Sequence, residues 1–295
     1  MLKKNNKIIA GIAALCLAVF LGLAVPAQEA PAPRKPGLKT RIIPLTPALA
    51  EVAADVLGAD LSPIVGITEF TDYPPGLTIK PSVGPYNQVN LEKIKSLKPD
   101  LILATTDGNT RDQVTHLKEL KLNVAVVSSR TLAEVKQSLE QVGVAMGDPA
   151  RGKEMREQLE RGLKRIESFA PKRKKALRVF LQLGDKPVIT VGAGSYLTEV
   201  LEMLGVENVY GDLPASYPRV SAEDVVRRAP DAVIVLSLGK NDQLFRHMAS
   251  QWYDFPDMPA AKSKHIEVLR SDGLLRPSLR LLEGIDRLQK QLKDW

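Results

Sequence analysis

Two aromatic side chains and two carboxylates recur at one spacing in the two halves of the sequence. Tyr86 lies six residues before Glu92, and Tyr217 lies six residues before Glu223. Both pairs match at a single offset of 131 residues. A phenol ring offers flat apolar area with a polar tip, so it suits a large and partly wet ligand. If the halves form two lobes, the tyrosines can face each other across the cleft. The alternative is that each packs under its own loop.

The two glutamates are expected in the first turns of helices. The helix dipole stabilises a carboxylate there by about 0.3–1 kcal/mol, which is a sufficient structural reason for either residue alone. Their symmetric placement permits a second interpretation. Glu92 and Glu223 would then be two exposed carboxylates, one in each half, that dock onto arginines of a two-fold membrane partner.

The repeat extends to the elements around these residues. Asn90 and Ser221 are expected helix caps, and the glutamate of each copy lies seven residues before a Pro-Asp pair. An apolar run, residues 101–103 or 232–234, follows each pair. The order of cap, helix, Pro-Asp and strand is common in α/β folds, so chance agreement remains open. The matched tyrosines favour two homologous lobes.

Short apolar runs alternate with helical patterns along the whole chain. We expect strands at 42–45, 64–68, 101–105, 124–128, 177–183, 188–191, 232–237 and 265–269. We expect helices at 47–57, 90–97, 195–204, 221–229 and 277–292, and helices opened by capping boxes at Thr110 and Thr131. This alternation predicts an α/β fold with two Rossmann-like lobes of mostly parallel sheets, joined by one long connecting α-helix. Ligands of such sheets sit beyond the carboxyl ends of the strands.

A charged helix is predicted between the two halves. Its apolar residues share one face at spacings of 4, 4 and 3, namely Met155, Leu159, Leu163 and Ile166. Two i,i+4 pairs support it, namely Glu157 with Arg161 and Glu160 with Lys164. At 1.5 Å per residue the helix is about 35 Å long, which is enough to bridge two lobes along one side.

The first 27 residues have the order of a secretory signal peptide. Three lysines precede an apolar run over residues 8–25, and the run ends in Val25-Pro26-Ala27. The alternative is a retained membrane anchor, because the run is at the short limit for spanning a bilayer. Leu15, before the single cysteine Cys16, is too large for a typical lipoprotein cleavage site, so we do not expect lipid attachment.

These patterns divide the chain into five segments. Residues 1–27 are the signal peptide, and the Pro- and Ala-rich residues 28–38 are a flexible lead-in. Residues 39–147 form the N-terminal α/β lobe, 148–171 the connecting helix and 172–295 the C-terminal α/β lobe.

Composition excludes several classes of function. The expected mature chain has no cysteine, which rules out a disulfide framework, a thiol nucleophile and a cysteine metal site. Without the leader lysines, 38 basic and 34 acidic side chains remain. This excess of positive charge is too small to indicate a nucleic-acid-binding protein. The histidines, at 116, 247 and 265, have no paired ligand spacing, so no metal site is expected. No Gly-x-Ser-x-Gly elbow or phosphate-binding glycine loop occurs, so we do not expect an enzyme.

Three stretches resemble the periplasmic cobalamin-binding proteins of ABC importers, which belong to the helical-backbone (class III) substrate-binding proteins. The first is Phe70-Thr-Asp72-Tyr73-Pro74-Pro75, followed by Tyr86 and Asn90-Leu-Glu92. The others are Val179-Phe180-Leu181-Gln182 and Tyr217-Pro218-x-Val220-Ser221-x-Glu223. The resemblance covers nearly all of residues 40–293.

This resemblance implies a periplasmic monomer that carries a corrinoid in its interlobe cleft and delivers it to an inner-membrane ABC permease dimer. Cobalamin would be the transported ligand, with no resident cofactor. The positions that match the family's ligand contacts are Phe70, Tyr86, Thr105, Ile189, Tyr217, Asp272 and Arg276. Glu92 and Glu223 match glutamates that form salt bridges with arginines of the permease.

The sequence departs from the better-known members in its aromatic residues. Tyr86 and Tyr217 replace indoles, Thr105 stands where an indole can stand, and Ile189 is aliphatic. Less stacking area predicts a weaker grip or a preference for another corrinoid. Asp272 and Arg276 keep their four-residue spacing. By the resemblance they hydrogen-bond the amide-rich rim of the ligand, and the alternative is a local ion pair.

Two other functions stay open at this point. A haem or iron–siderophore binding protein would share the architecture. Siderophore clefts usually need several Arg or Lys side chains, whereas the expected cleft offers chiefly Arg276. A non-transport interaction protein on the same two lobes is the second alternative.

Overall fold

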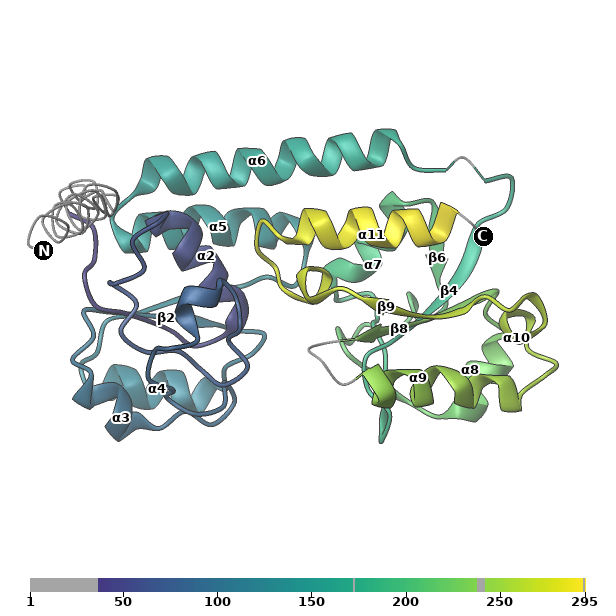
Figure 1. The fold of residues 1–295 in the computed structure, drawn as a ribbon, viewed down its shortest axis with the longest axis horizontal. Helices are drawn as coiled ribbons and strands as arrows, with labels where there is room; N and C mark the ends of the chain where they lie inside the picture. The colour runs from purple at the N-terminus through teal and green to yellow at the C-terminus, as the bar shows by residue number, and fades with distance from the viewer. Residues whose placement is uncertain (1–36, 172, 238–241, 294) are drawn as a thin grey trace, which may run out of the picture. The chain divides into compact units, whose positions relative to one another are not determined.

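Two separate parallel sheets form the framework of the protein, seen in the computed structural model in Figure 1. The first has the order β1 (Ile42–Pro44), β2 (Leu101–Thr105), β3 (Val124–Val127). The second has the order β6 (Val206–Asn208), β4 (Leu177–Gln182), β8 (Ala232–Ser237), β9 (Ile266–Arg270). A small antiparallel ribbon pairs β5 (Val188–Ile189) with β7 (Arg219–Val220). The expected α/β fold with mostly parallel sheets is confirmed.

The structure describes residues 37–171, 173–237, 242–293 and 295. The expected signal peptide and residues 28–36 of the expected lead-in lie outside this range. All described residues belong to one unit, Lys35–Trp295. None of the helices in the described ranges is long and apolar enough to cross a membrane.

Local capping explains where the N-terminal helices begin. In α2 (Pro47–Leu57) the Thr46 hydroxyl accepts the Leu49 N–H at 3.2 Å, and in α3 (Leu91–Ser96) the Asn90 side chain caps the first turn. A full capping box opens α4 (Arg111–Glu119). Thr131 caps α5 (Leu132–Met146), but the expected second half of its box is wrong. The Glu134 carboxylate instead accepts hydrogen bonds from Ser128 and from the Arg130 N–H.

The C-terminal half carries further helices around the second sheet. They are α7 (Tyr196–Met203), α8 (Ala222–Arg228), α9 (Asp242–Ser250), α10 (Pro259–Ser263) and α11 (Leu281–Lys293). Short 3-10 turns lie at η1 (Pro75–Leu77), η2 (Gln251–Asp254) and η3 (Asp272–Leu275). Helices α9 and α10 have no counterpart among the expected helices. The helix expected over 277–292 begins only at Leu281.

The strand expected at 64–68 is wrong. Ile64 makes an isolated bridge to Ile42, and Ile67 makes another to Ser82. The backbone changes partner after two residues, because the Val65 N–H bonds to β1 while the Ile67 N–H bonds to the carbonyl of residue 81. No ladder can grow from such a segment. The strand expected at 188–191 likewise ends at Ile189.

The two faces of each strand pack in different cores because side chains alternate along a strand. Ile42 and Leu103 of the first sheet share one continuous apolar cluster with Leu181 and Ile234 of the second. Helices α2, α5, α6, α7 and α11 contribute to this cluster. The opposite faces form separate cores, one with α3 and α4 and one with α8 and α9. Apolar packing therefore runs without interruption from one lobe to the other.

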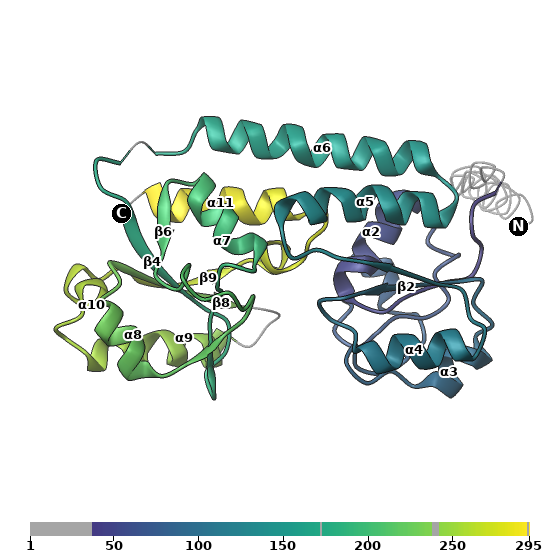
Figure 2. The ribbon, with the colours of Figure 1, turned by 180° about the vertical axis from the view of Figure 1, so that it is seen from behind.

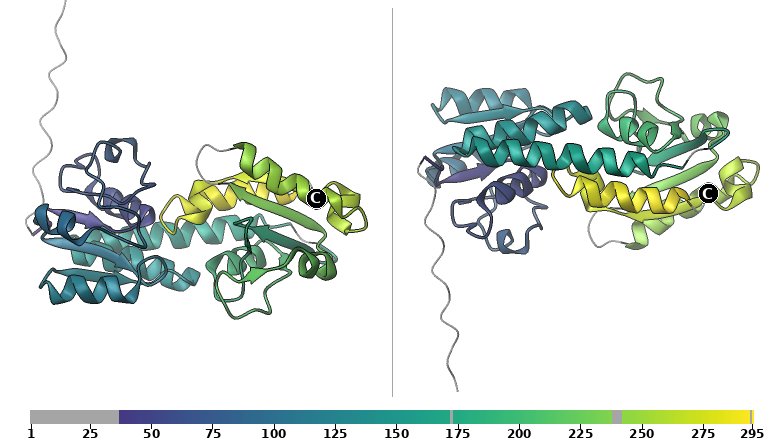
Figure 3. Two further views of the ribbon diagram at one scale, coloured as in Figure 1. Left: turned by 90° about the horizontal axis from the view of Figure 1, so that it is seen from below. Right: turned by 90° about the horizontal axis from the view of Figure 1, so that it is seen from above.

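Helix α6 (Pro149–Ser168) is the connecting helix, and it runs along one side of both halves (Figures 1 and 2). Its four predicted apolar residues are all buried. Both predicted ion pairs form, at 3.6 Å for Arg161 with Glu157 and 3.0 Å for Lys164 with Glu160. Helix α6 lies against α5 and α11, and Figure 3 shows the three helices side by side from above. The segment boundaries drawn from sequence stay a prediction.

The sequence repeat has a structural counterpart in the two lobes. Arg41 donates from Nε to the Lys98 carbonyl at 2.9 Å, and Arg178 donates from Nη1 to the Ala229 carbonyl at 3.1 Å. Lys98 and Ala229 both have a φ of +47°, a left-handed conformation that ends the helix before each Pro-Asp pair. The aspartate of each pair then accepts a backbone N–H at the start of the first strand of its sheet. Equivalent clamps thus fix α3 and α8 on their sheets.

We predict that Gly143→Ala destabilises the protein. A Cβ at Gly143 would meet the backbone of Gly152 where α5 crosses α6, and a Cβ at Gly152 would lie 2.7 Å from the Glu140 carbonyl oxygen. Overpacking of this kind costs about 1–3 kcal/mol and outweighs the helix propensity gained with alanine. Urea unfolding measures the loss. Val144→Ala, at an exposed position of α5, is the control and should shift the unfolding free energy by less than about 0.5 kcal/mol. Equal stability of Gly143→Ala and wild type would contradict the tight crossing.

Candidate functional site

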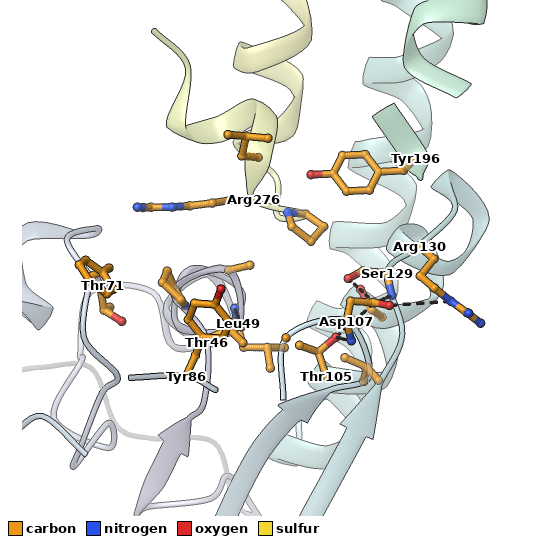
Figure 4. A pocket seen from close by; sticks show the side chains of 18 of the residues that line it. Thr46, Leu49, Thr71, Tyr86, Thr105, Asp107, Ser129, Arg130, Tyr196 and Arg276 are labelled. Atoms are coloured by element: carbon orange, nitrogen blue, oxygen red, sulfur yellow. Dashed lines mark hydrogen bonds and ion pairs between the residues drawn. The ribbon is translucent and has the colours of Figure 1, made fainter. Parts of the chain in front are cut away.

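A cavity of about 640 Å³ lies where loops of the N-terminal lobe meet the C-terminal lobe (Figure 4). Three groups of its residues lie where the strands of the first sheet end. They are residues 46–49 after β1, Thr105, Asp107 and Gly108 at the end of β2, and Val127, Ser129 and Arg130 at the end of β3. This is the carboxyl end of a parallel sheet, where ligands of α/β folds bind. The C-terminal lobe supplies Tyr196, Tyr217 and residues 275–277.

Five of the seven expected ligand positions line this cavity, namely Phe70, Tyr86, Thr105, Tyr217 and Arg276. Ile189 and Asp272 are not among the lining residues. Ile189 belongs to the β5–β7 ribbon, where its side chain packs over Gly184. Asp272 opens the η3 turn. Their positions do not indicate direct contact with a ligand in this cavity.

Aromatic rings form much of the accessible wall. Phe70 is 74% exposed, Tyr86 41% and Tyr217 43%. Phe70 has a φ of +66°, an uncommon conformation for a bulky residue, and it lines the cavity. Tyr196 is buried, and its hydroxyl donates to the Leu274 carbonyl at 2.9 Å. From sequence, Tyr196 was expected only as a residue of a helix.

Arg276 lies in a buried ion network that joins the lobes. Its Nη1 donates to Oε1 of Glu51 at 2.9 Å and to Oδ1 of Asp72 at 2.6 Å. Arg280 and Ser278 also donate to Glu51, at 2.7 and 2.6 Å. The Glu51 side chain, on α2, is only 1% exposed. One carboxylate of the N-terminal lobe therefore receives three donors from the C-terminal lobe. Arg276, which was expected to contact the rim of the ligand or to form a local ion pair, lines the cavity and is paired across the lobes.

The pKa of Arg276 reflects these contacts. Burial works to lower it, but the hydrogen bonds with Asp72 and Glu51 raise the pKa above its ordinary value. Arg280 also lies over the ring of Tyr73, with its guanidinium carbon 3.9 Å from the ring centroid. Removing one partner of such a buried pair typically costs about 3–5 kcal/mol.

Asp107 is a cavity residue that sequence reasoning missed. Its Oδ2 accepts the Ser129 N–H at 2.7 Å and the Ser129 hydroxyl at 3.1 Å. Its side chain is 18% exposed. After burial, the charge of Asp107 also contributes to raising the pKa of Tyr196 and of Tyr217, so it acts across to the other lobe. The available signal was its place two residues after β2.

Asp55 lies one helical turn after Glu51 on α2. Burial, with a smaller contribution from the charge of Glu51, raises the pKa of Asp55 to about 6 against the opposing charges of Arg151 and Arg280. Within the described ranges, no group of three His, Cys, Asp or Glu side chains could hold a metal ion. Aromatic rings and a few fixed polar groups line the cavity, a combination that is common in binding sites for small molecules.

Glu92 and Glu223 do not line the cavity. Both are exposed, in the first turns of α3 and α8. Hydrogen bonds from its own backbone N–H and from Ser221 lower the pKa of Glu223. Figures 1 and 2 show α3 and α8 on the same side of the two lobes, the side away from α6.

Known proteins are similar to this chain in sequence and in fold. The profile of the periplasmic binding protein family matches residues 42–272. The vitamin B12-binding protein of Vibrio vulnificus (strain YJ016) is 34% identical over 253 residues, which cover 84% of this chain and 88% of that protein.

Two solved structures extend the comparison. The periplasmic vitamin B12 binding protein BtuF of Vibrio cholerae superposes with a TM-score of 0.75 at 28% identity, over 87% of this chain and 97% of that one. The periplasmic heme-binding protein RhuT from Roseiflexus sp. RS-1 also gives a TM-score of 0.75, over 87% of this chain and 98% of that one. Its identity is 20%, so that likeness shows the fold alone.

We predict that Asp55→Asn changes the pH dependence of stability. The folded pKa of about 6 lies above the ordinary 3.8, so the folded state holds this proton more tightly. The stability that it contributes is present below about pH 4 and is lost as the pH rises through 6. Relative to wild type, Asp55→Asn should therefore gain about 1–2 kcal/mol between pH 4 and pH 7. Urea unfolding across this range measures it, with the exposed Asp112→Asn as control. Parallel curves for Asp55→Asn and wild type would refute the shift.

Proposed function

Because this chain belongs to the periplasmic binding protein family, we propose that it binds a corrinoid between its lobes and delivers it to an ABC importer. One observation carries the proposal. The aromatic rings of Phe70, Tyr86 and Tyr217 gather from both lobes around one cavity at the carboxyl end of the first sheet. The relatives named as vitamin B12-binding proteins support the choice of corrinoid.

The exposed rings suit a large ligand with a flat apolar face. Aromatic side chains that stay exposed together in a concave site usually mark a surface that a ligand covers. Stacked rings contribute about 0.5–1.5 kcal/mol beyond the area that they bury. Because tyrosines stand where the resemblance places indoles, we expect a lower affinity for the ligand than that of an indole-lined cleft.

A haem or iron–siderophore binder of the same fold is the alternative. The likeness to the haem-binding structure supports the fold and leaves the ligand open. Haem propionates and siderophore carboxylates favour arginines that are free to pair with them. Both arginines that line the cavity already face carboxylates, at 2.9 and 2.6 Å for Arg276 and at 3.8 and 3.9 Å for Arg130. This arrangement favours a ligand without carboxylates.

In the same proposal the protein works in the periplasm and leaves its ligand chemically unchanged. The basic and apolar order of residues 1–27 supports export by a signal peptide. The periplasmic binding protein family that the chain matches, and its likeness to a periplasmic vitamin B12 binding protein, support this location. We propose that it acts as a monomer with no resident cofactor.

Closure around the ligand should be small. Besides α6, the continuous apolar cluster and the Glu51 network both join the lobes. A hinge motion of large amplitude would expose that cluster and break buried ion pairs. We therefore propose that the importer distinguishes the loaded form by a subtle change at its docking surface.

Glu92 and Glu223 are proposed as the docking residues. Equivalent arginine clamps hold α3 and α8 on their sheets, so one exposed carboxylate is presented by each lobe on the same side. A dimeric permease with two symmetric arginine sites would fit such a pair. Charged groups of this kind steer and orient a partner.

The ligand assignment is tested by calorimetric titration with cyanocobalamin. Wild type should bind saturably, and the Tyr86→Ala, Tyr217→Ala double variant should bind at least about ten-fold more weakly, since both stacking rings are lost. Tyr253→Ala removes a tyrosine of similar exposure outside the cavity and should keep wild-type affinity. If wild type released or absorbed no heat of binding at high micromolar cyanocobalamin, the assignment of a corrinoid ligand would be contradicted.

The docking assignment is tested by uptake into proteoliposomes that hold the cognate importer. Glu92→Lys with Glu223→Lys should abolish cyanocobalamin uptake and leave ligand affinity unchanged. The control, Glu154→Lys with Glu167→Lys, makes the same charge change on α6, on the other side of the molecule. Unimpaired uptake by the first double variant would mean that Glu92 and Glu223 have no role in docking and only stabilise the first turns of their helices.

A further inference from the structure

The hydrogen-bonding capacity of Asp107 is divided between its two oxygens. Oδ2 is occupied by the N–H and hydroxyl of Ser129, with the Thr105 hydroxyl at 3.4 Å. Around Oδ1 lie the Thr106 hydroxyl at 3.4 Å and the Arg130 Nε at 3.8 Å, the latter beyond hydrogen-bond distance. A carboxylate oxygen has two lone pairs, so Oδ1 keeps acceptor capacity. Figure 4 shows Asp107 beside Thr105 and Ser129, with Tyr196 and Arg276 across the cavity.

The charges around the cavity favour donors over acceptors. Arg276 lies between Glu51 and Asp72, and Arg130 lies between Asp107 and Glu134. With Arg280, which also pairs with Glu51, three arginines therefore face four carboxylates. At Arg276 a ligand carboxylate would have to displace a protein carboxylate that is already paired with the guanidinium. At Arg130 it would approach the negative charges of Asp107 and Glu134. A ligand N–H group meets no such obstacle.

We propose that Asp107 makes the cavity select ligands whose edge carries N–H donors, such as primary carboxamides, and reject ligands whose edge carries carboxylates. This proposal rests on the proposed function and deepens it, since it names the chemistry at the ligand's edge. Asp107 is the specificity-determining residue, because its charge strengthens a hydrogen bond from an N–H donor and repels an anion. Asp72 adds to the preference by pairing with Arg276 at the accessible rim.

The position of Asp107 allows a substitution that removes its charge and keeps its contact with Ser129. In Asp107→Asn the side-chain carbonyl oxygen can still accept the Ser129 N–H, so the loop after β2 keeps its main contact. The charge is lost, and an amide N–H₂ takes the place of one acceptor oxygen. Asp72→Asn is a second, independent variant. The Asp72 side chain is 50% exposed and Arg276 keeps its buried partner Glu51, so we expect this variant to fold. It leaves Arg276 with one carboxylate fewer.

The experiment compares two probes by calorimetry. One is cyanocobalamin, and the other is its derivative in which one peripheral carboxamide is hydrolysed to a carboxylate. Wild type should prefer cyanocobalamin. Asp107→Asn should bind cyanocobalamin roughly ten-fold more weakly and the carboxylate derivative more tightly than wild type does, so the preference shrinks or reverses. Asp72→Asn should also gain affinity for the derivative.

The control is Asp112→Asn, which makes the same charge change at an exposed position of α4 outside the cavity and should keep the wild-type preference. Thermal unfolding confirms that each variant is folded. If Asp107 were only structural, both affinities would fall together and the ratio would stay constant.

The outcomes separate this proposal from the proposed function. An unchanged ratio in Asp107→Asn, with wild type binding cyanocobalamin, would overturn the role of Asp107 in selectivity whatever Asp72→Asn does, and it would leave the corrinoid function standing. Equal wild-type affinity for the two probes would overturn it as well. Wild type that binds neither probe would instead contradict the corrinoid function itself, and the selectivity with it.

Discussion

The arrangement of the two lobes depends on one buried carboxylate. Glu51 of α2 accepts hydrogen bonds from Arg276, Ser278 and Arg280, all from the segment that leads into α11. A charge so deeply buried is tolerated only when its oxygens are fully partnered, so the segment must stay where these donors reach α2. The same segment forms the C-terminal wall of the cavity. The site and the contact between lobes are therefore one structure.

Local signals explain how much of the fold could be predicted. The caps at Thr46, Asn90 and Thr110 act within three residues, and the apolar face of α6 repeats every turn, so both were readable from sequence. Tyr86 and Tyr217 were brought to one cavity as the repeat suggested. The run at 64–68 has the composition of a strand, but its backbone partners come from two different segments, and no local pattern reveals that.

The charges of the site were less accessible to prediction. Arg276 and Glu51 are 225 residues apart, and nothing near either residue marks the other as its partner. The sequence therefore suggested only a contact with the ligand or a local ion pair for Arg276, and the structure shows that it also joins the lobes through Glu51. Asp107 follows β2 in a polar loop, which was a usable sign, but its importance appears only when the neighbouring arginines are seen to be paired. The electrostatic character of a cavity depends on such long-range pairs.

We propose that a corrinoid occupies the cavity between the lobes. A crystal structure of the protein with cyanocobalamin, with anomalous data collected at the cobalt absorption edge, tests this proposal. We expect a single cobalt peak in the cavity, between the loop of residues 105–108 and Tyr217. A cobalt site elsewhere on the protein, or none in a fully ligand-saturated crystal, would contradict it.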